Sequence, residues 1–216
     1  MRVALFGGTF DPPHRGHIRI AQAAADAYRL DSVLFAPVAL QPLKAGLETA
    51  PFSERLAMVQ LACAADSRFS ASTIDAPRAD GEPNYTIDTL TDLRRQHPTA
   101  ILFNLIGADS FLHLRQWRES NRLLTTVDWI VVSRPGSPLD DLTPLQLTET
   151  ERSHIHLLTN VSEDVSATEL RRKLAAGEDC ANLLPSSVAA YIRQHGLYST
   201  RYQISPASLD SSSGSG

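Results

Sequence analysis

Short apolar segments alternate along this chain with longer segments of helical periodicity, and no other feature of the sequence constrains its fold as strongly. Each apolar segment is bounded by glycine, proline or polar residues, and the four segments cover residues 3–6, 32–36, 101–106 and 127–132. The helical segments between them are long enough to cross back over a sheet, and they cover residues 16–30, 53–65 and 86–97. This alternation predicts an α/β fold with a doubly wound parallel sheet.

The second half of the chain is less regular. Residues 133–150 contain several prolines among polar residues and are predicted to form a long surface connection. After it we expect a last strand over residues 154–158. Two helices should follow, over residues 166–176 and 186–195, and a glycine directly follows each of them.

Length and composition favour a single domain. A chain of 216 residues with 43% hydrophobic residues can build one well-buried core, although two small domains are also possible. We expect one domain over residues 1–200. The chain ends in a segment dominated by serine and glycine, so residues 201–216 are predicted to be a disordered tail.

Charge and apolar content exclude several classes of partner. The formal net charge of −4 argues against a surface that holds nucleic acid, while a small phosphorylated ligand remains compatible. No apolar run approaches the roughly 20 residues of a membrane span, and the two cysteines, Cys63 and Cys180, lack the neighbours of a zinc or redox motif. We therefore expect a cytoplasmic protein without nucleic-acid or membrane partners, and a homo-oligomer is possible.

The first predicted strand runs directly into two glycines, and a helix follows shortly after them. Gly7 and Gly8 allow the backbone to approach a phosphate closely, at the strand end where open α/β sheets bind ligands. His14 and His17 are spaced to lie together at the first turn of the helix, with Gly16 between them. Such a pair can stabilise the negative charge of a transferred phosphoryl group, although two histidines there can also be structural or bind a metal.

A second helix start, near residue 166, has the same capacity for anions. Ser166 and Glu169 have the spacing of a capping box, which needs no role in catalysis. The unpaired N–H groups of such a helix start also attract phosphate, and Arg171 lies one turn inside the helix, where its planar fork can add to that attraction.

These two segments resemble the signatures of the HxGH nucleotidyltransferase superfamily, whose members have a Rossmann-like fold. The first signature corresponds to residues 7–17, Gly-Gly-Thr-Phe-Asp-Pro-Pro-His-Arg-Gly-His, and the second to Ser166, Thr168 and Arg171. Further segments, among them residues 84–90, 106–110 and 188–198, resemble the bacterial nicotinate-nucleotide adenylyltransferase family. The resemblance covers nearly everything from residue 2 to residue 199.

The resemblance implies a role for each site residue. The catalytic set is His14, His17, Arg171 and Lys44. The residues expected to bind ATP are Gly7, Gly8, Thr9, Phe10, Gly16, Gly107, Asp109, Arg134, Ser166 and Thr168. The residues expected to bind the mononucleotide are Thr86, Trp117 and Lys44.

Several of these residues also have a purely structural interpretation. Asp109 and Thr86 can each be a helix cap. The ring of Trp117 is expected to stack on the pyridine of the mononucleotide, but Trp117 can also be a half-buried core residue. Arg134 can be an ordinary surface arginine. The loop that contains Lys44 departs from the family pattern, because leucine and glutamine replace polar or shaping residues at positions 40, 41 and 43.

The implied reaction joins AMP from ATP to nicotinic acid mononucleotide and releases pyrophosphate. A phosphate monoester is already ionised and nucleophilic, so no general base is required, and Mg²⁺ is expected to be carried on ATP. Nicotinamide mononucleotide or phosphopantetheine could also be the acceptor, and a non-catalytic nucleotide-binding protein could have the same fold. The intact histidine pair favours an enzyme.

Overall fold

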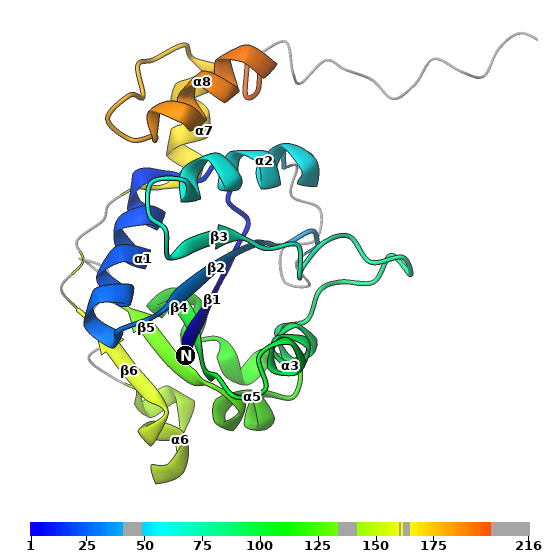
Figure 1. Cartoon of the computed structure of the whole chain (residues 1–216), viewed down its shortest axis with the longest axis vertical. Helices are drawn as coiled ribbons and strands as arrows, with labels where there is room; N and C mark the ends of the chain where they lie inside the picture. Colours follow the sequence, from blue (N-terminus) through cyan, green and yellow to red (C-terminus); the bar gives the residue numbers. More distant parts are fainter. Residues whose placement is uncertain (41–48, 134–141, 160, 162–164, 200–216) are drawn as a thin grey trace, which may run out of the picture.

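A six-stranded parallel sheet forms the centre of the protein. The computed structural model describes residues 1–40, 49–133, 142–159, 161 and 165–199. The strands have the order β3-β2-β1-β4-β5-β6 (Figure 1). They are β1 (Arg2–Gly8), β2 (Ser32–Pro37), β3 (Phe69–Ala71), β4 (Ile101–Gly107), β5 (Asp128–Val132) and β6 (Ile155–Leu158), and every pair is parallel. The predicted doubly wound α/β sheet is confirmed.

Helices cover both faces of the sheet, as the alternation in the sequence predicted. The longer helices are α1 (Arg15–Tyr28), α2 (Phe52–Cys63), α3 (Thr86–Gln96), α7 (Ala167–Ala175) and α8 (Ser186–His195). The shorter ones are α4 (Ala108–Phe111), η2 (Leu114–Gln116), α5 (Ser120–Thr126), η3 (Thr143–Leu145) and α6 (Glu149–Ser153). In Figure 1, α1 and α2 lie on one side of the sheet and α3 and α5 on the other.

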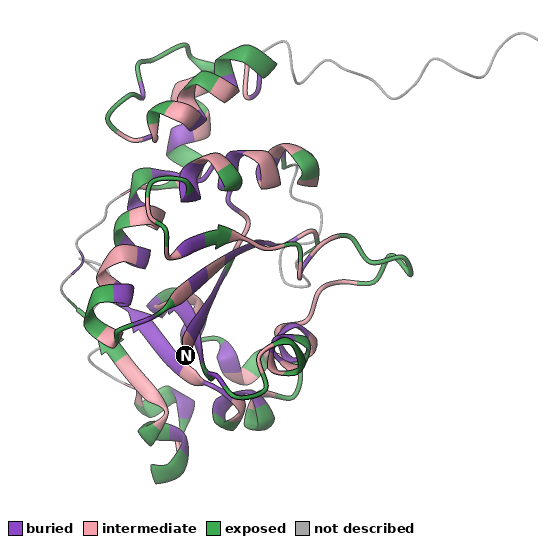
Figure 2. Ribbon diagram, in the orientation of Figure 1, coloured by how far each residue is buried: buried purple, intermediate pink, exposed green. Residues whose placement is uncertain are grey.

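The side chains of β1 show how the two layers are formed. Val3 and Leu5 belong to the core that also contains residues of α3 and α5, whereas Ala4 and Phe6 belong to the core that contains residues of α1 and α2. Successive side chains of a strand point to opposite faces, so a continuous apolar run fills both cores. Figure 2 shows the resulting burial of the central strands. Helices α7 and α8 pack on α2 through a third cluster.

Some elements differ from the sequence prediction. The strand β3 was not anticipated, because three residues are too few to show a period. The surface connection predicted over residues 133–150 contains η3 and the start of α6 in its described part, two short elements that the sequence did not predict. A capping box between Thr148 and Glu151 starts α6.

The ends of the last two helices agree with their glycines. Gly177 and Gly196 have φ values of +71° and +62°, the left-handed conformation that ends a helix easily when no Cβ is present. The predicted disordered tail falls on residues outside the described part of the chain. Among the described residues, no helix has the length and apolar character needed to cross a membrane. The cytoplasmic location and the oligomeric state stay predictions.

Candidate active site

The candidate site lies where the strand order reverses, at the carboxyl ends of β1 and β4. The strand β2, which follows β1 along the chain, lies on one side of β1, and β4 lies on the other side. This reversal opens a crevice between the loops that follow β1 and β4. A cavity of about 460 Å³ occupies this region, and its lining includes Gly7, Gly8, Thr86, Asp109 and Trp117. Five of the residues predicted for the site therefore face one cavity.

The glycines at the strand ends have distinct physical roles. A Cβ atom at Gly7 would meet nothing within 4 Å, so this strand end is open to a ligand. A Cβ at Gly8 would lie 3.2 Å from Cζ of Phe10, and one at Gly107 would lie 2.6 Å from Oδ1 of Asp109. Gly107 is therefore needed for the Asp109 carboxylate to fold back toward the end of β4.

His14 and His17 are brought together at the start of α1, as the spacing predicted. Their rings stack with centroids 3.7 Å apart, and the backbone N–H of His14 donates a hydrogen bond to Nδ1 of His17 at 3.2 Å. Because Nδ1 accepts this bond, the neutral His17 ring carries its proton on Nε2. His17 therefore has a defined donor atom, which is what stabilisation of a developing negative charge requires.

The ring of His17 also connects the histidine pair to the glycine loop. It lies 5.0 Å from the ring of Phe10, which is buried and packs against Gly8. The Phe10 side chain thus belongs to the core, so its predicted contact with ATP is restricted to its backbone. Gly16 is buried in the first turn of α1, and Thr9 is half-buried.

Asp11 connects this loop to segments far away in the sequence. Its carboxylate accepts a hydrogen bond from the Tyr198 hydroxyl at 2.6 Å. Nη1 of Arg171 lies 3.9 Å from the same carboxylate and donates a hydrogen bond to the backbone oxygen of Asp11 at 2.8 Å. Burial raises the pKa of Tyr198, and the nearby Asp11 carboxylate raises it further. Arg171 is thus held against the first signature, as expected if both signatures bind one triphosphate.

Arg55 is a second support of the loop, and the sequence interpretation gave it no role. Its side chain is only 2% exposed, and it donates to the backbone oxygens of Thr9 and Val38 at 2.8 Å each and of Ala50 at 2.9 Å. Burial lowers the pKa of Arg55, and the negative charge of Asp11 opposes that change. Arg55 therefore fixes the backbone around the site.

The second helix start behaves partly as a cap. Ser166 is the N-cap of α7, and its hydroxyl accepts the N–H of Glu169 at 3.4 Å. The carboxylate of Glu169 pairs with Arg172 at 2.8 Å. Thr168 is exposed, and its hydroxyl lies 3.4 Å from Nη2 of Arg171. Ser166 is therefore a cap as predicted, but the reciprocal half of the capping box is absent, because the Glu169 carboxylate pairs with Arg172. The exposed residues of this turn stay available to a ligand.

At the other end of the site, Thr86 is the first residue of α3 and Tyr85 is its N-cap, so the interpretation of Thr86 as a cap is wrong. Both residues line the cavity. Trp117 is half-buried, packs against the core below α3 and also lines the cavity. The interpretation of Trp117 as a half-buried core residue is confirmed, and its stacking on a pyridine ring stays a prediction. The interpretation of Asp109 as an N-cap is wrong, because the N-cap of α4 is Gly107.

Two predicted site residues, Lys44 and Arg134, lie outside the described part of the chain, as do Gln41 and Leu43 of the divergent loop. Leu40 is described, and its N–H donates to Oδ1 of Asn84 at 3.3 Å. Within the described residues, no group of three or more histidines, cysteines or acidic residues could hold a metal ion.

Asp75 is a cavity residue that the sequence interpretation missed. Its side chain is buried and accepts a hydrogen bond from the Thr89 hydroxyl at 2.5 Å. Burial raises the pKa of Asp75 to about 6, and the bond from Thr89 opposes that rise. The residue lies in a loop between β3 and α3, and no local pattern marks it.

We expect Asp75→Asn to raise the free energy of unfolding at pH 8 by about 1–3 kcal/mol. The folded protein binds the Asp75 proton more tightly than the unfolded chain does. The stabilisation by the protonated form is therefore complete below the ordinary pKa of 3.8 and is lost as the pH rises through about 6. Asparagine stays neutral and keeps an acceptor for Thr89.

Urea unfolding at pH 8 and at pH 4.5 measures this difference, which should be much smaller at the lower pH. Asp92→Asn is the matched control, because Asp92 is exposed on α3 and pairs only with Arg95 among the described residues. An equal gain from Asp75→Asn at both pH values would contradict the assigned cause.

Comparison with known proteins identifies what this chain resembles. A model of the cytidylyltransferase-like family matches residues 5–173. A protein of Pelobacter propionicus is 39% identical over 92% of this chain and 99% of its own length, and one of Roseiflexus sp. is 40% identical over 91% and 97%. Both are named "probable nicotinate-nucleotide adenylyltransferase".

The fold is also that of a solved structure. The nicotinic acid mononucleotide adenylyltransferase of Plasmodium falciparum, complexed with NaAD, superposes with a TM-score of 0.74. The alignment covers 91% of this chain and 97% of that one at 17% sequence identity. The match supports the Rossmann-like arrangement of the sheet and its flanking helices.

Proposed function

Because the chain belongs to the cytidylyltransferase-like family and, within it, to the nicotinate-nucleotide adenylyltransferases, we propose that it transfers AMP from ATP to nicotinic acid mononucleotide. The products are nicotinic acid adenine dinucleotide and pyrophosphate, which places the reaction in NAD biosynthesis. The observation that carries the proposal is the stacked pair of His14 and His17, which Phe10 connects to Gly8 in the lining of the cavity.

In the proposed reaction, a phosphate oxygen of the mononucleotide attacks the α-phosphorus of ATP. One P–O bond forms to the mononucleotide, and the bond between the α-phosphorus and the bridging oxygen breaks, so pyrophosphate leaves with its Mg²⁺. The attacking phosphate is already ionised, and the protein therefore needs to align two anions and stabilise the charge that shifts between them.

The described residues divide this work between two ends of the site. His14, His17 and the backbone at Gly7 and Gly8 are proposed to face the α-phosphate, and Arg171 to hold the outgoing phosphates from α7. Lys44 and Arg134 are proposed to add positive charge from their loops. Mg²⁺ enters as part of the substrate Mg²⁺–ATP, with its charge spread over the phosphates.

The base and ribose of the nucleotides are assigned to the cavity. Trp117 offers an aromatic face for the pyridine ring, and Thr86 lies at the start of α3, where backbone N–H groups attract an anionic substituent. Gly107 and Asp109 follow β4 at the same edge, where a carboxylate can accept hydrogen bonds from ribose hydroxyls.

Pyrophosphate release from the purified protein tests the proposal. The protein is incubated with Mg²⁺–ATP and separately with nicotinic acid mononucleotide, nicotinamide mononucleotide or phosphopantetheine. We expect the acid mononucleotide to give the highest kcat/KM, by at least about tenfold over the amide. A higher kcat/KM with another acceptor would refute the acceptor assignment, and no release with any acceptor would indicate a non-catalytic nucleotide-binding protein.

A further inference from the structure

We propose that Arg118 pairs with the carboxylate of the pyridine base and thereby sets the preference for the acid over the amide. This inference rests on the proposed function and adds a residue that decides specificity. Arg118 directly follows Trp117 in the chain, and both residues line the cavity. A ring stacked on Trp117 therefore lies in the same cavity as the Arg118 side chain.

The charges of the cavity lining favour a role for such a cation. Among the described residues that line the cavity, Asp75 and Asp109 carry carboxylates, and Arg118 is the only arginine or lysine. An anionic substituent that enters beside two carboxylates is disfavoured unless a cation faces it, whereas an uncharged amide meets no such repulsion. Without Arg118, only the backbone N–H groups at the start of α3 would offset these two carboxylates, and the preference for the acid would be smaller.

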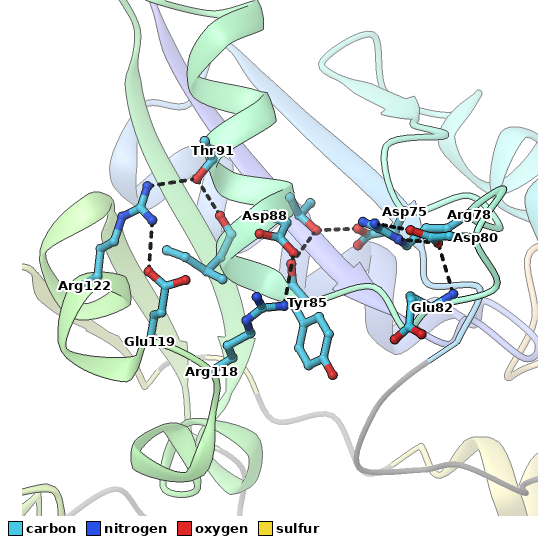
Figure 3. A network of polar contacts seen from close by, with 12 residues as sticks. Asp75, Arg78, Asp80, Glu82, Tyr85, Asp88, Thr91, Arg118, Glu119 and Arg122 are labelled. Carbon is cyan, nitrogen blue, oxygen red and sulfur yellow. Dashed lines mark hydrogen bonds and ion pairs between the residues drawn. The ribbon is translucent and has the colours of Figure 1, made fainter.

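The structure holds the Arg118 side chain close to the start of α3. Its guanidinium lies over the Tyr85 ring at 4.8 Å from the centroid, and Nη1 lies 3.9 Å from Oδ2 of Asp88 in the first helical turn. Figure 3 shows Arg118 reaching toward Asp88 beside the Tyr85 ring. The cation and the N-terminus of α3 thus stand next to each other, and both attract an anion.

The contact with Asp88 leaves N–H donors of the Arg118 guanidinium available to a ligand. The ion pair is long, and both side chains are about half-exposed, at 54% for Arg118 and 46% for Asp88, so their mutual attraction is weak. A guanidinium has five N–H donors in a planar fork that matches a carboxylate. Stacking on Tyr85 restricts the guanidinium without occupying this fork, which suits it to bind a second anion.

The neighbouring Arg122 offers a matched control. It lies four residues further along, is 56% exposed and pairs with Glu119 at 3.0 Å, while Nη2 lies 3.4 Å from the Thr91 hydroxyl. Figure 3 shows it beside a later turn of α3, and it is not among the cavity residues. A general effect of removing one positive charge from this surface should therefore appear equally when Arg118 and when Arg122 is replaced.

The test compares Arg118→Gln, Arg118→Lys, Arg122→Gln and the unmodified protein, each with both mononucleotides at saturating Mg²⁺–ATP. We expect Arg118→Gln to lower kcat/KM for the acid by about 10- to 100-fold and to change kcat/KM for the amide by less than about threefold. Arg118→Lys keeps the charge and loses the planar fork, so its loss with the acid should be intermediate. Arg122→Gln should match the unmodified protein, and a separate titration of ATP should give the same KM for ATP in every variant.

Two kinds of failure are distinguishable in this experiment. If the unmodified protein turns over the acid and Arg118→Gln keeps the same ratio of acid to amide, the Arg118 assignment is wrong and the proposed function stands. If the unmodified protein releases no pyrophosphate with the acid, the proposed function fails, and the assignment falls with it. An equal loss in Arg118→Gln and Arg122→Gln would also overturn the assignment.

Discussion

Replacing His17 with alanine is expected to lower kcat by about 10²–10³-fold and to change the KM for ATP much less. The hydrogen bond from the His14 backbone to Nδ1 orients the His17 ring and leaves the proton on Nε2. The donor is thus fixed before the reaction, and its contribution grows as charge develops on the α-phosphate. Removing one such preorganised donor affects the transition state more than the bound substrate.

Steady-state kinetics over a range of ATP concentrations separates the two effects. His17→Gln is the informative second variant, because its amide can present an N–H donor and should recover part of the loss. His97→Ala is the matched control, since His97 follows the last turn of α3, at the end of the helix away from the cavity. A kcat within about threefold of the unmodified protein, with folding intact by circular dichroism, would remove His17 from the catalytic set.

The fold was largely predictable because its main signals are local. The strands β1, β2, β4 and β5 are short apolar runs with clear boundaries, and α1 and α3 carry an apolar stripe that a single window reveals. The strand β3 lacked this signal, since its three residues pair with β2 only because α2 returns the chain to that edge. Its pairing is a tertiary effect.

The sequence predicted the local part of the site better than the contacts between distant segments. Gly7, Gly8, His14 and His17 lie within 11 residues of each other, so their spacing alone indicated a phosphate site. The contacts of Asp75 and Tyr198 gave no such indication, because each of these side chains meets its partner only in the folded protein. Asp11 and Tyr198, for example, are 187 residues apart and meet only in the folded protein.

Asp11 carries the second large expected effect, on stability. Its carboxylate is 1% exposed and accepts from the Tyr198 hydroxyl at 2.6 Å and from the Ala50 N–H at 3.3 Å. The positive charge of buried Arg55 also interacts with it. Removing the carboxylate leaves these donors without their acceptor and the buried guanidinium without a nearby anion. Breaking a buried charge interaction from one side costs about 3–5 kcal/mol, a large share of the 5–15 kcal/mol that typically stabilises a domain.

We therefore expect Asp11→Ala to lower the free energy of unfolding by about 3–5 kcal/mol in urea titrations at pH 7. Asp11→Asn keeps the shape and one acceptor oxygen and should lose less, so the difference between the two variants separates charge from hydrogen bonding. Asp26→Ala is the control: Asp26 is 71% exposed and pairs with Arg68, and an exposed pair contributes about 0–1 kcal/mol. Arg171 lies 3.9 Å from Oδ2 of Asp11 and donates to its backbone oxygen at 2.8 Å, so a folded Asp11→Asn protein should also show a raised KM for ATP. If Asp11→Ala were no less stable than the Asp26 control, Asp11 could not be the residue that ties the first signature to α7 and to Tyr198.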